Sequence, residues 1–423
     1  MISRTRLGLA LLAVAGTLAC STNDSSTTNP CAGITGTCVG FAAGTSEEAI
    51  SGAFATAAEG TLLVFGPGTF HFTNELDVTV ANVTVRGAGS DATVLDFGGN
   101  GAQGILASAD HFTMQDLAIR DSGGNGVKVV GADYVTIRNV HVSWTDPDLT
   151  THGGYGIYPV QSHHVLVEDS FTSGATDTGI YIGQSQDIVA RNNESTGNVA
   201  GLEIENCYRA DVHDNYIHGN TGGILVFDLP GLAQQGGNTV RVFDNQIIEN
   251  NHPNFAPLGT TLSLVPAGAG ITVMANHDVE VFGNLIQGNQ TTAVSVISYF
   301  LTGNEIPGGY FPFPRIVHVH DNQVAWNGTA PDQNTQLGYL LASIQDQVFA
   351  GSPLPDVIWD GIPMDVGENP NQICVGAGHS WLSLGAYPTT DPDTGDPTLG
   401  FAPSVASDPY RCSIDPIDAV TPW

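Results

Sequence analysis

The chain has 423 residues, of which 42 are acidic and 11 are basic, so its formal net charge is −31 at pH 7. Hydrophobic residues make up 41% of it, which excludes a globally disordered chain and suffices for a large core. Nucleic acid is excluded as a partner, because phosphate binding needs clustered cations and Lys128 is the only lysine. Two interpretations of the acidity stay open: a solvated surface, or binding of a divalent cation such as Ca²⁺.

The first segment has the form of an export signal. Arg4 and Arg6 precede the apolar run 7–18, and small residues then lead to Cys20. A cysteine at this place resembles the lipobox of bacterial lipoproteins. We therefore expect a signal peptide at residues 1–19, lipidation of Cys20 and a polar tether at residues 20–44. The expected location is the cell envelope, with membrane contact through the lipid anchor alone.

Two more signals lie before the repetitive part of the chain. Cys31 and Cys38 bracket a short loop, and we expect them to pair, since disulfides are permitted outside the cytosol. Residues 45–58 form an amphipathic pattern that predicts a short helix, with Thr45 or Ser46 as its N-cap. We expect this helix to close the N-terminal end of a domain spanning residues 45–332.

One phrase recurs along the middle of the chain. A short alternating strand ends in an asparagine, and five residues later come a second asparagine, a turn of small residues and another strand. Earlier units keep the strands without the asparagines, and the base unit is 22–23 residues long. The first asparagines are Asn193, Asn215, Asn245, Asn284 and Asn322, and the second are Asn198, Asn220, Asn250, Asn289 and Asn327.

Short strands separated by short turns cannot bury an apolar face alone. Stacked at roughly 4.8 Å per coil, they share one long core. The repeat therefore predicts an all-β solenoid, a right-handed parallel β-helix of about nine to eleven coils. We expect the asparagines to stack as hydrogen-bonded ladders at the turns, because asparagine tolerates the left-handed conformation and carries both a donor and an acceptor.

The units resemble those of the right-handed β-helix superfamily of carbohydrate-binding proteins and sugar hydrolases, which includes pectate lyases, polygalacturonases and alginate epimerases. The phrases GIYIGQSQDIVARNN, NVAGLEIEN and GNTGGILVFDLPGL more closely resemble an uncharacterised group of exported bacterial β-helix repeat lipoproteins, which tend to be encoded beside an exported c-type cytochrome. The resemblance covers roughly residues 60–330. It implies a polysaccharide or glycan as partner and, as an alternative, a cytochrome-type partner protein.

The strand after each second asparagine offers the best candidate site. Alternate residues of this strand face outward, and the insertions 145–154, 229–238, 250–268 and 300–314 flank it. Insertions on both sides of one sheet would wall a cleft, and its aromatic and polar floor suits sugar rings. The predicted substrate-binding residues are Tyr158, Tyr181, Gln184, Phe227, Asp177 and His152.

Glu203 and Glu205 are the predicted catalytic pair, with Asp228 at the end of the next strand. Their i, i+2 spacing puts their Cα atoms roughly 6.6 Å apart on one face, a separation that suits the acid and base of an inverting glycoside hydrolase. Close like charges would also raise the pKa of one carboxyl group. Two other interpretations stay open: solvated glutamates without a role, or a calcium site completed by Asp228 and Asp177.

A lyase or epimerase would need a cation beside the substrate carboxylate. Arg86, Arg138, Arg191 and His213 fall in one outward column and could supply it. The arginines could instead simply pair with Glu168, Asp169 or Asp214. The loop at 146–148 resembles the Asp-Pro-His-Asp loop of alginate epimerases but lacks the histidine. Elsewhere, His318 and His320 share one strand face and could hold a metal of unknown identity weakly, with ordinary surface histidines as the alternative.

Residues 333–423 lose the repeat. We expect a C-terminal cap with loops, held by a disulfide between Cys374 and Cys412, and Cys207 is left as a buried free thiol. No complete catalytic motif is present, so whether the chain is an enzyme stays open. The two hypotheses are a polysaccharide hydrolase or lyase, and a non-catalytic binding or scaffold protein for a glycan or an exported cytochrome.

Overall fold

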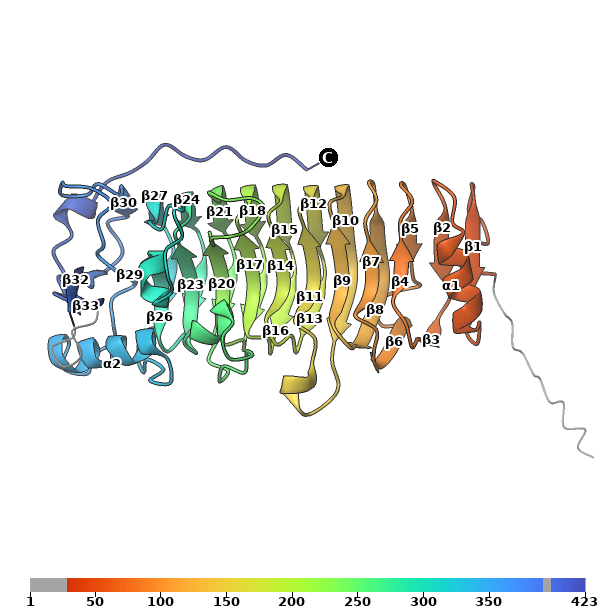
Figure 1. Cartoon of the computed structure of the whole chain (residues 1–423), viewed down its shortest axis with the longest axis horizontal. Helices are drawn as coiled ribbons and strands as arrows, with labels where there is room; N and C mark the ends of the chain where they lie inside the picture. Colours follow the sequence, from red (N-terminus) through yellow and green to blue (C-terminus); the bar gives the residue numbers. More distant parts are fainter. Residues whose placement is uncertain (1–28, 391–396, 423) are drawn as a thin grey trace, which may run out of the picture.

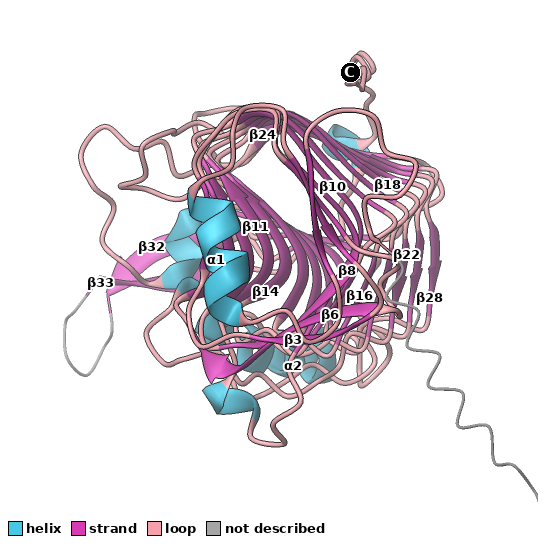
Figure 2. Ribbon diagram, turned by 90° about the vertical axis from the view of Figure 1, so that its right-hand side faces the viewer, coloured by secondary structure: helices cyan, strands magenta, loops and turns pink. Residues whose placement is uncertain are grey.

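The computed structural model describes residues 29–390 and 397–422, so the expected signal peptide and Cys20 lie outside the described residues. The described part is an elongated stack of coils, with the N-terminal coil at one end and the C-terminal coils at the other (Figure 1). Viewed along the stack, each coil encloses the same core (Figure 2). No helix among the described residues is long and apolar enough to cross a membrane.

Sheet B forms one face of the stack. Its eleven strands are hydrogen-bonded in coil order, and successive strands are parallel. The strands are β4 (Leu76–Val78), β7 (Gln103–Ala107), β9 (Asn125–Val130), β11 (Tyr155–Val160), β14 (Thr178–Gly183), β17 (Ala200–Glu205), β20 (Gly222–Phe227), β23 (Ala269–Met274), β26 (Thr292–Ile297), β29 (Val357–Trp359) and β31 (Trp381–Ser383).

Sheet A has twenty strands and forms the two other faces, which are joined because β8 (Thr113–Ser122) and β10 (Asp133–Ser143) run across the corner between them. The remaining strands of the first face are β1 (Cys38–Phe41), β2 (Leu62–Phe65), β5 (Thr84–Arg86), β12 (His163–Glu168), β15 (Gln186–Arg191), β18 (Tyr208–His213), β21 (Asn238–Phe243), β24 (His277–Phe282), β27 (Arg315–His320) and β30 (Ile373–Val375). Those of the second face are β3 (Gly68–His71), β6 (Thr93–Asn100), β13 (Phe171–Ser173), β16 (Glu194–Thr196), β19 (Tyr216–His218), β22 (Gln246–Ile248), β25 (Leu285–Gln287) and β28 (Gln323–Ala325).

The stack extends past both ends of the predicted repeat domain. β1 lies within the segment expected to be a tether and pairs in parallel with β2. At the other end, Val357 pairs with Val294 and Ile373 with Val317, so parallel stacking continues beyond residue 332. The insertion that carries helix α2 (Gln336–Val348) interrupts the sequence repeat without interrupting the sheets.

Both ends of the stack are closed. Helix α1 (Glu47–Ala55) is capped by the Ser46 hydroxyl, as predicted, and buries Ile50 and Phe54 over the first coils (Figure 2). At the far end, α2 packs on the outside of β29 and β31, and the short helix η4 (Asp408–Tyr410) places Tyr410 against Trp359 and Trp381. The antiparallel hairpin of β32 (Ala386–Thr390) and β33 (Pro397–Phe401) follows the last coil. The disulfides Cys31–Cys38 and Cys374–Cys412 lie at the two ends, and Cys207 is a buried free thiol.

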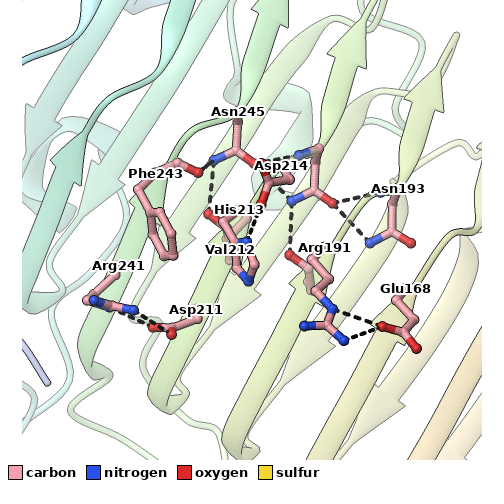
Figure 3. Close-up of polar contacts among 12 residues, drawn as sticks. Glu168, Arg191, Asn193, Asp211, Val212, His213, Asp214, Arg241, Phe243 and Asn245 are labelled. Carbon is pink, nitrogen blue, oxygen red and sulfur yellow. Dashed lines mark hydrogen bonds and ion pairs between the residues drawn. The ribbon is translucent and has the colours of Figure 1, made fainter. Parts of the chain in front are cut away.

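The predicted asparagine ladders are confirmed. In each, the side-chain Nδ2 of one asparagine donates to Oδ1 of the asparagine in the next coil, from Asn193 to Asn215 at 3.0 Å and from Asn215 to Asn245 at 2.9 Å (Figure 3). The ladder asparagines themselves do not take the left-handed conformation. The preceding residue does, with φ of 54° at both Asn192 and Asp214, so the ladder side chain is aimed inward by its neighbour's turn.

Candidate functional site

The outer face of sheet B is covered over one half and open over the other. In the covered half, outward side chains of β20, β23 and β26 form a second apolar cluster with the insertions, which include the short helices η2 (Thr261–Leu264) and η3 (Tyr299–Thr302). Leu262 and Tyr310, for example, pack in the same cluster as Leu225 and Met274. The insertions therefore cover much of this half of the strip, and the predicted cleft is reduced to a small pocket between residues 261–266 and 301–302, with Phe227, Met274 and Ile297 on its floor. The insertions pack onto the strip because this removes apolar side chains of both the sheet and the insertions from water.

Three tyrosines and three carboxyl groups meet at the boundary between the two halves. Tyr155 and Tyr158 come from β11 and Tyr181 comes from β14, and their ring centroids are 4.5–5.0 Å apart. Asp177 precedes β14, and Glu203 and Glu205 lie on β17 in the next coil. We call these six residues the tyrosine–carboxyl cluster. The tyrosine rings on β11 and the Asp177 side chain are half-buried, so this edge of the cluster faces solvent.

The two glutamates of the cluster are buried rather than exposed on a cleft floor. Glu203 has an exposed fraction of 0%, its Oε2 accepts a 2.9 Å hydrogen bond from Thr178, and its Oε1 has no partner. Glu205 is 7% exposed, and its Oε1 accepts a 2.6 Å hydrogen bond from the Tyr181 hydroxyl. The sequence placed both side chains on the outward face, and the register agrees, pairing Tyr181 with Glu203. Both glutamate side chains thus point away from the core of the coils and are still buried.

Burial makes this cluster hold protons. It raises the pKa of Glu205 to about 7 and that of Asp177 to about 6. The pKa of Glu203 is raised well above its ordinary value, first by burial and then by the negative charges of Glu205 and Asp177. The Thr178 hydroxyl lies 2.9 Å from Glu203 and 3.1 Å from Asp177, and its single hydrogen can serve only one of them at a time. A proton on one carboxyl group satisfies the other contact.

No counter-ion balances these carboxyl groups. None of the ion pairs within residues 29–390 and 397–422 involves Asp177, Glu203 or Glu205. The nearest cation to the tyrosines is Lys128, whose Nζ lies 4.8 Å from the Tyr158 ring centroid, a cation–π contact. The three carboxyl groups of the cluster also do not bring one oxygen each within 4.8 Å of one another. The single group of three such side chains that the described residues bring together lies on sheet A.

Three of the other predicted site residues, His152, Asp228 and Gln184, form hydrogen bonds to main-chain groups of loops. His152 is buried, with ring nitrogens 2.7 Å from the carbonyl oxygens of Gly174 and Asp146. Asp228 accepts a 2.8 Å hydrogen bond from the Gly237 amide, and burial raises its pKa to about 6. Gln184 accepts from the Ala233 amide, and Phe227 is 2% exposed in the second apolar cluster. None of the four lies on an open surface of the cluster.

The arginine column is an ion-pair ladder. Oε2 of Glu168 accepts a 2.8 Å hydrogen bond from Arg191 (Figure 3). Oε1 of Glu168 accepts one from Arg138, so the simpler interpretation of the sequence holds for both arginines. Two of the three candidate arginines are thus occupied by a carboxylate. The loop at 146–148 closes on itself, because Asp148 accepts from the Thr150 amide and hydroxyl.

Sequence reasoning missed Tyr155, Thr178 and Gly183. Tyr155 and Thr178 begin their strands, where the repeat register places an outward column of mostly small residues. Gly183 aligns with Glu205, and a Cβ atom built on it would lie 2.2 Å from the Tyr181 hydroxyl oxygen. The missing side chain is what lets the Tyr181 ring lie across the strand to reach Glu205. The signal for this was a glycine in an outward column next to a glutamate.

Comparisons with known proteins were made for sequence and for structure. Residues 69–240 match the family model described as a right-handed beta-helix region. Comparison with curated protein sequences finds none that matches. Among solved structures, the chain is similar to the A-module of the Azotobacter vinelandii mannuronan C-5 epimerase AlgE4, with 17% identity over 74% of this chain and 77% of that chain and a TM-score of 0.45. It is also similar to an alginate lyase from Paenibacillus sp. str. FPU-7, with 16% identity over 68% of this chain and 95% of that chain and a TM-score of 0.48.

The strand pairing and the sequence match agree about the architecture. Successive strands of sheet B and of both faces of sheet A stack in parallel, coil upon coil. Parallel strands joined in this way are connected with a right-handed turn in nearly all proteins. Together with the match over residues 69–240, this identifies the chain as a right-handed parallel β-helix protein.

Proposed function

We propose that this chain is an exported protein that binds a polysaccharide along the open half of the outer face of sheet B. The observation that carries the proposal is the solvent-facing edge of the tyrosine–carboxyl cluster. There, the half-buried rings of Tyr155 and Tyr158 lie 4.5 Å apart beside the half-buried Asp177. Aromatic rings offer flat apolar surfaces for the faces of pyranose rings, and a carboxylate accepts hydrogen bonds from sugar hydroxyls.

The strip extends from the cluster toward the N-terminus. Lys128 and Leu106 precede Tyr158 in the same outward column, both half-buried, and the exposed Asp77 comes before them. One column step is one coil, about 4.8 Å, so four coils give a platform roughly as long as three sugar units. A net charge of −31 disfavours polyanions, which supports a neutral polysaccharide as the ligand.

The arrangement supports binding better than hydrolysis by the predicted pair. An inverting hydrolase holds a water between two carboxyl groups and the sugar. Glu203 is completely buried and bonded to Thr178, so it cannot contact a substrate on the surface. Glu205 is bonded to Tyr181 and nearly as buried. We therefore place these two glutamates beneath the binding strip, where they hold Tyr181 and the strip's edge in position.

Export and lipid anchoring belong to the same proposal. The signal-like segment 1–19 and Cys20 motivate them, and the two disulfides support a compartment outside the reducing cytosol. Incorporation of labelled palmitate into the wild-type chain, and its loss in Cys20→Ser, tests the anchor. Label that persists in Cys20→Ser would contradict it.

The binding experiment measures retention on neutral and acidic polysaccharides by affinity electrophoresis, with calorimetry on soluble oligosaccharides that bind. We expect Tyr158→Ala to weaken binding at least tenfold, which corresponds to about 1.4 kcal/mol. Tyr339→Ala is the matched control, because Tyr339 is 64% exposed on α2 and far from the strip in sequence, and it should bind as wild type. Equal binding by all three chains, or none by wild type, would contradict the proposal. Release of reducing ends or unsaturated products would instead show an enzyme.

A further inference from the structure

Sheet A carries a compact group of nitrogen and oxygen ligands on its outer face, away from the polysaccharide strip proposed on sheet B. β24 and β27 are neighbours, and their register pairs Glu280 with His318 and Phe282 with His320. His318 and His320 are two residues apart on one strand, so both project from the same face as Glu280. One ligand atom of each of the three side chains lies within 4.8 Å of the others. Within the described residues, this is the one such group that includes three side chains.

The contacts of His320 prepare its other nitrogen to bind a metal. Its Nδ1 lies 2.8 Å from Oδ2 of Asp321, and in a neutral ring this acceptor keeps the hydrogen on Nδ1. Nε2 then carries the lone pair, and it lies 3.0 Å from Oε1 of Glu280. A carboxylate behind a metal-bound histidine is the common second contact in zinc sites. Two ligands with bonds of about 2.0–2.1 Å to one ion lie roughly 2.9–3.4 Å apart, so the 3.0 Å separation suits a shared ion.

A proton on Nε2 of His320 would also satisfy that contact, and His318 is what distinguishes the two cases. Its exposed fraction is 8%, and its Nδ1 is buried without a hydrogen-bond partner. An unsatisfied buried nitrogen costs about 1–3 kcal/mol. The rings of His318 and His320 are stacked with their centroids 4.0 Å apart, and a ligand atom of each lies within 4.8 Å of a Glu280 oxygen. A single proton cannot satisfy all three side chains, whereas one cation can.

The neighbouring charges leave Glu280 available. Arg241 is its partner in the preceding coil, but that guanidinium is held by both oxygens of Asp211, at 2.8 Å and 2.6 Å (Figure 3). The second oxygen of Glu280 accepts a 3.3 Å hydrogen bond from the Ile417 amide. The Ile417 contact positions the carboxylate without neutralising its charge.

The C-terminal segment covers the group. Cys374, in the next coil, is the register partner of His318 and is joined to Cys412. From there the chain runs back over the coils of sheet A (Figure 1), where the Val420 amide donates to Asp211 at 3.0 Å. The cover shields the site from bulk water, and the His320 side chain remains 19% exposed as an entrance for a small ion.

We propose that Glu280, His318 and His320 form a binding site for one divalent transition-metal ion, with Zn²⁺ as the best match to two imidazoles and one carboxylate. Ca²⁺ and Mg²⁺ prefer an all-oxygen set and should not compete. Three protein ligands leave a fourth position on a tetrahedral ion for water. The site is on a different sheet from the sugar strip and stands independently of polysaccharide binding.

The test uses the full tag-free chain, stripped by chelator and dialysed against limiting Zn²⁺, with metal per chain measured by mass spectrometry. We expect one ion per chain. His318→Ala and His320→Ala should each weaken affinity at least hundredfold, and Asp321→Asn about tenfold. His213→Ala is the matched control: His213 makes the same Nδ1 contact to its following aspartate, 2.7 Å to Asp214, and stacks on Phe243 at 4.7 Å. It should bind as wild type.

A second readout keeps the test decisive if a histidine variant folds poorly. Excess Zn²⁺ should raise the thermal midpoint of wild type and His213→Ala but not that of Glu280→Gln, whereas Ca²⁺ should shift none of them. Bound Co²⁺ should give the visible absorption of a four- or five-coordinate ion. Less than a tenth of an ion per wild-type chain would overturn the proposal, as would full stoichiometry and unchanged affinity in His318→Ala.

Discussion

The Tyr181 hydroxyl donates a 2.6 Å hydrogen bond to Oε1 of Glu205, one coil further along the stack. The ring reaches that far because it passes over Gly183, the residue that pairs with Glu205. A tyrosine, a glycine and a glutamate are thus one unit, although no two of them are adjacent in the sequence. The unit joins the open half of the strip to its covered half.

Gly183→Ala should break this unit. The added Cβ would lie 2.2 Å from the Tyr181 hydroxyl oxygen and 2.4 Å from a ring carbon, so the ring must move and the bond to Glu205 is lost. We expect a loss of about 1–3 kcal/mol in the free energy of unfolding, measured by urea denaturation. Gly308→Ala is the control, since a Cβ there meets nothing within 4 Å. Equal stability of the two variants would show that the ring's position carries no energy.

Glu205 should make the protein less stable as pH rises through the weakly acidic range. Burial raises its folded pKa to about 7, above an unfolded value of about 4.3. Between these values the folded chain holds a proton that the unfolded chain releases, so stability falls as pH rises from about 4.5 to 7. Glu205→Gln removes this dependence and keeps an acceptor for Tyr181. From pH 4.5 to 7.5, wild type should lose about 2–3 kcal/mol more than the variant.

Glu168→Gln is the control of opposite sign. Burial acts to raise the pKa of Glu168, but the hydrogen bonds from Arg191 and Arg138 outweigh burial and lower it. Its contribution is therefore present at neutral pH and is lost only as pH falls below the ordinary glutamate range. Between pH 4.5 and 7.5 this variant should keep the wild-type slope. A Glu205→Gln slope equal to that of wild type would contradict the assignment of the proton to this cluster.

Tyr310→Phe should loosen the cover of the closed half without removing its packing. The Tyr310 hydroxyl donates a 2.6 Å hydrogen bond to the main-chain oxygen of Asp228, 82 residues away, and its ring packs on Tyr299. Loss of the hydroxyl leaves a buried carbonyl unpaired, at a local cost of about 1–2 kcal/mol. Hydrogen exchange of residues 299–313 should quicken by roughly tenfold, while exchange in β20 stays slow. Tyr216→Phe, at a residue that is 39% exposed, should leave both segments unchanged.

The fold could be predicted from the sequence because the repeat is a local signal renewed in every coil. Each ladder asparagine occupies the same turn of its coil, as the hydrogen bond between Asn193 and Asn215 shows. Aligning these asparagines therefore gives the register of the strands in every coil that has them. The coil at β29 and β31 could not be predicted in this way, because a helix interrupts the period before it. In that region the positions of the strands are set by their pairing with the preceding coil, and no sequence repeat marks them.

The site could be predicted only in part. Period-two alternation placed Tyr158, Tyr181, Glu203 and Glu205 on the outward face, and the structure brings them together. The alternation of residues along a strand does not reveal whether an insertion packs onto the outward face or stands beside it. That depends on apolar residues such as Leu262, whose partners are on other coils. Glu203 lies between Tyr181 and Leu225 in the outward column and is completely buried, which makes it a proton-holding acid and not a solvent-facing one.

A negative charge in the asparagine ladder should destabilise the protein by an amount that depends on how deeply the substituted asparagine, or rung, is buried. Asn215→Asp replaces an amide that donates to Ala190 and Asn245, at 2.9 Å each, with a carboxylate facing two oxygens in a buried column. We expect a loss of 3 kcal/mol or more, roughly the cost of an uncompensated buried charge. Asn322→Asp is the comparison, because this last rung is only half-buried, and its contact with Nε2 of His379 is made by the main-chain N–H, which the substitution keeps. It should cost less than half as much, since water can reach the new charge. Urea denaturation at pH 7 measures both, and equal losses at the two rungs would show that burial along the column does not set their energy.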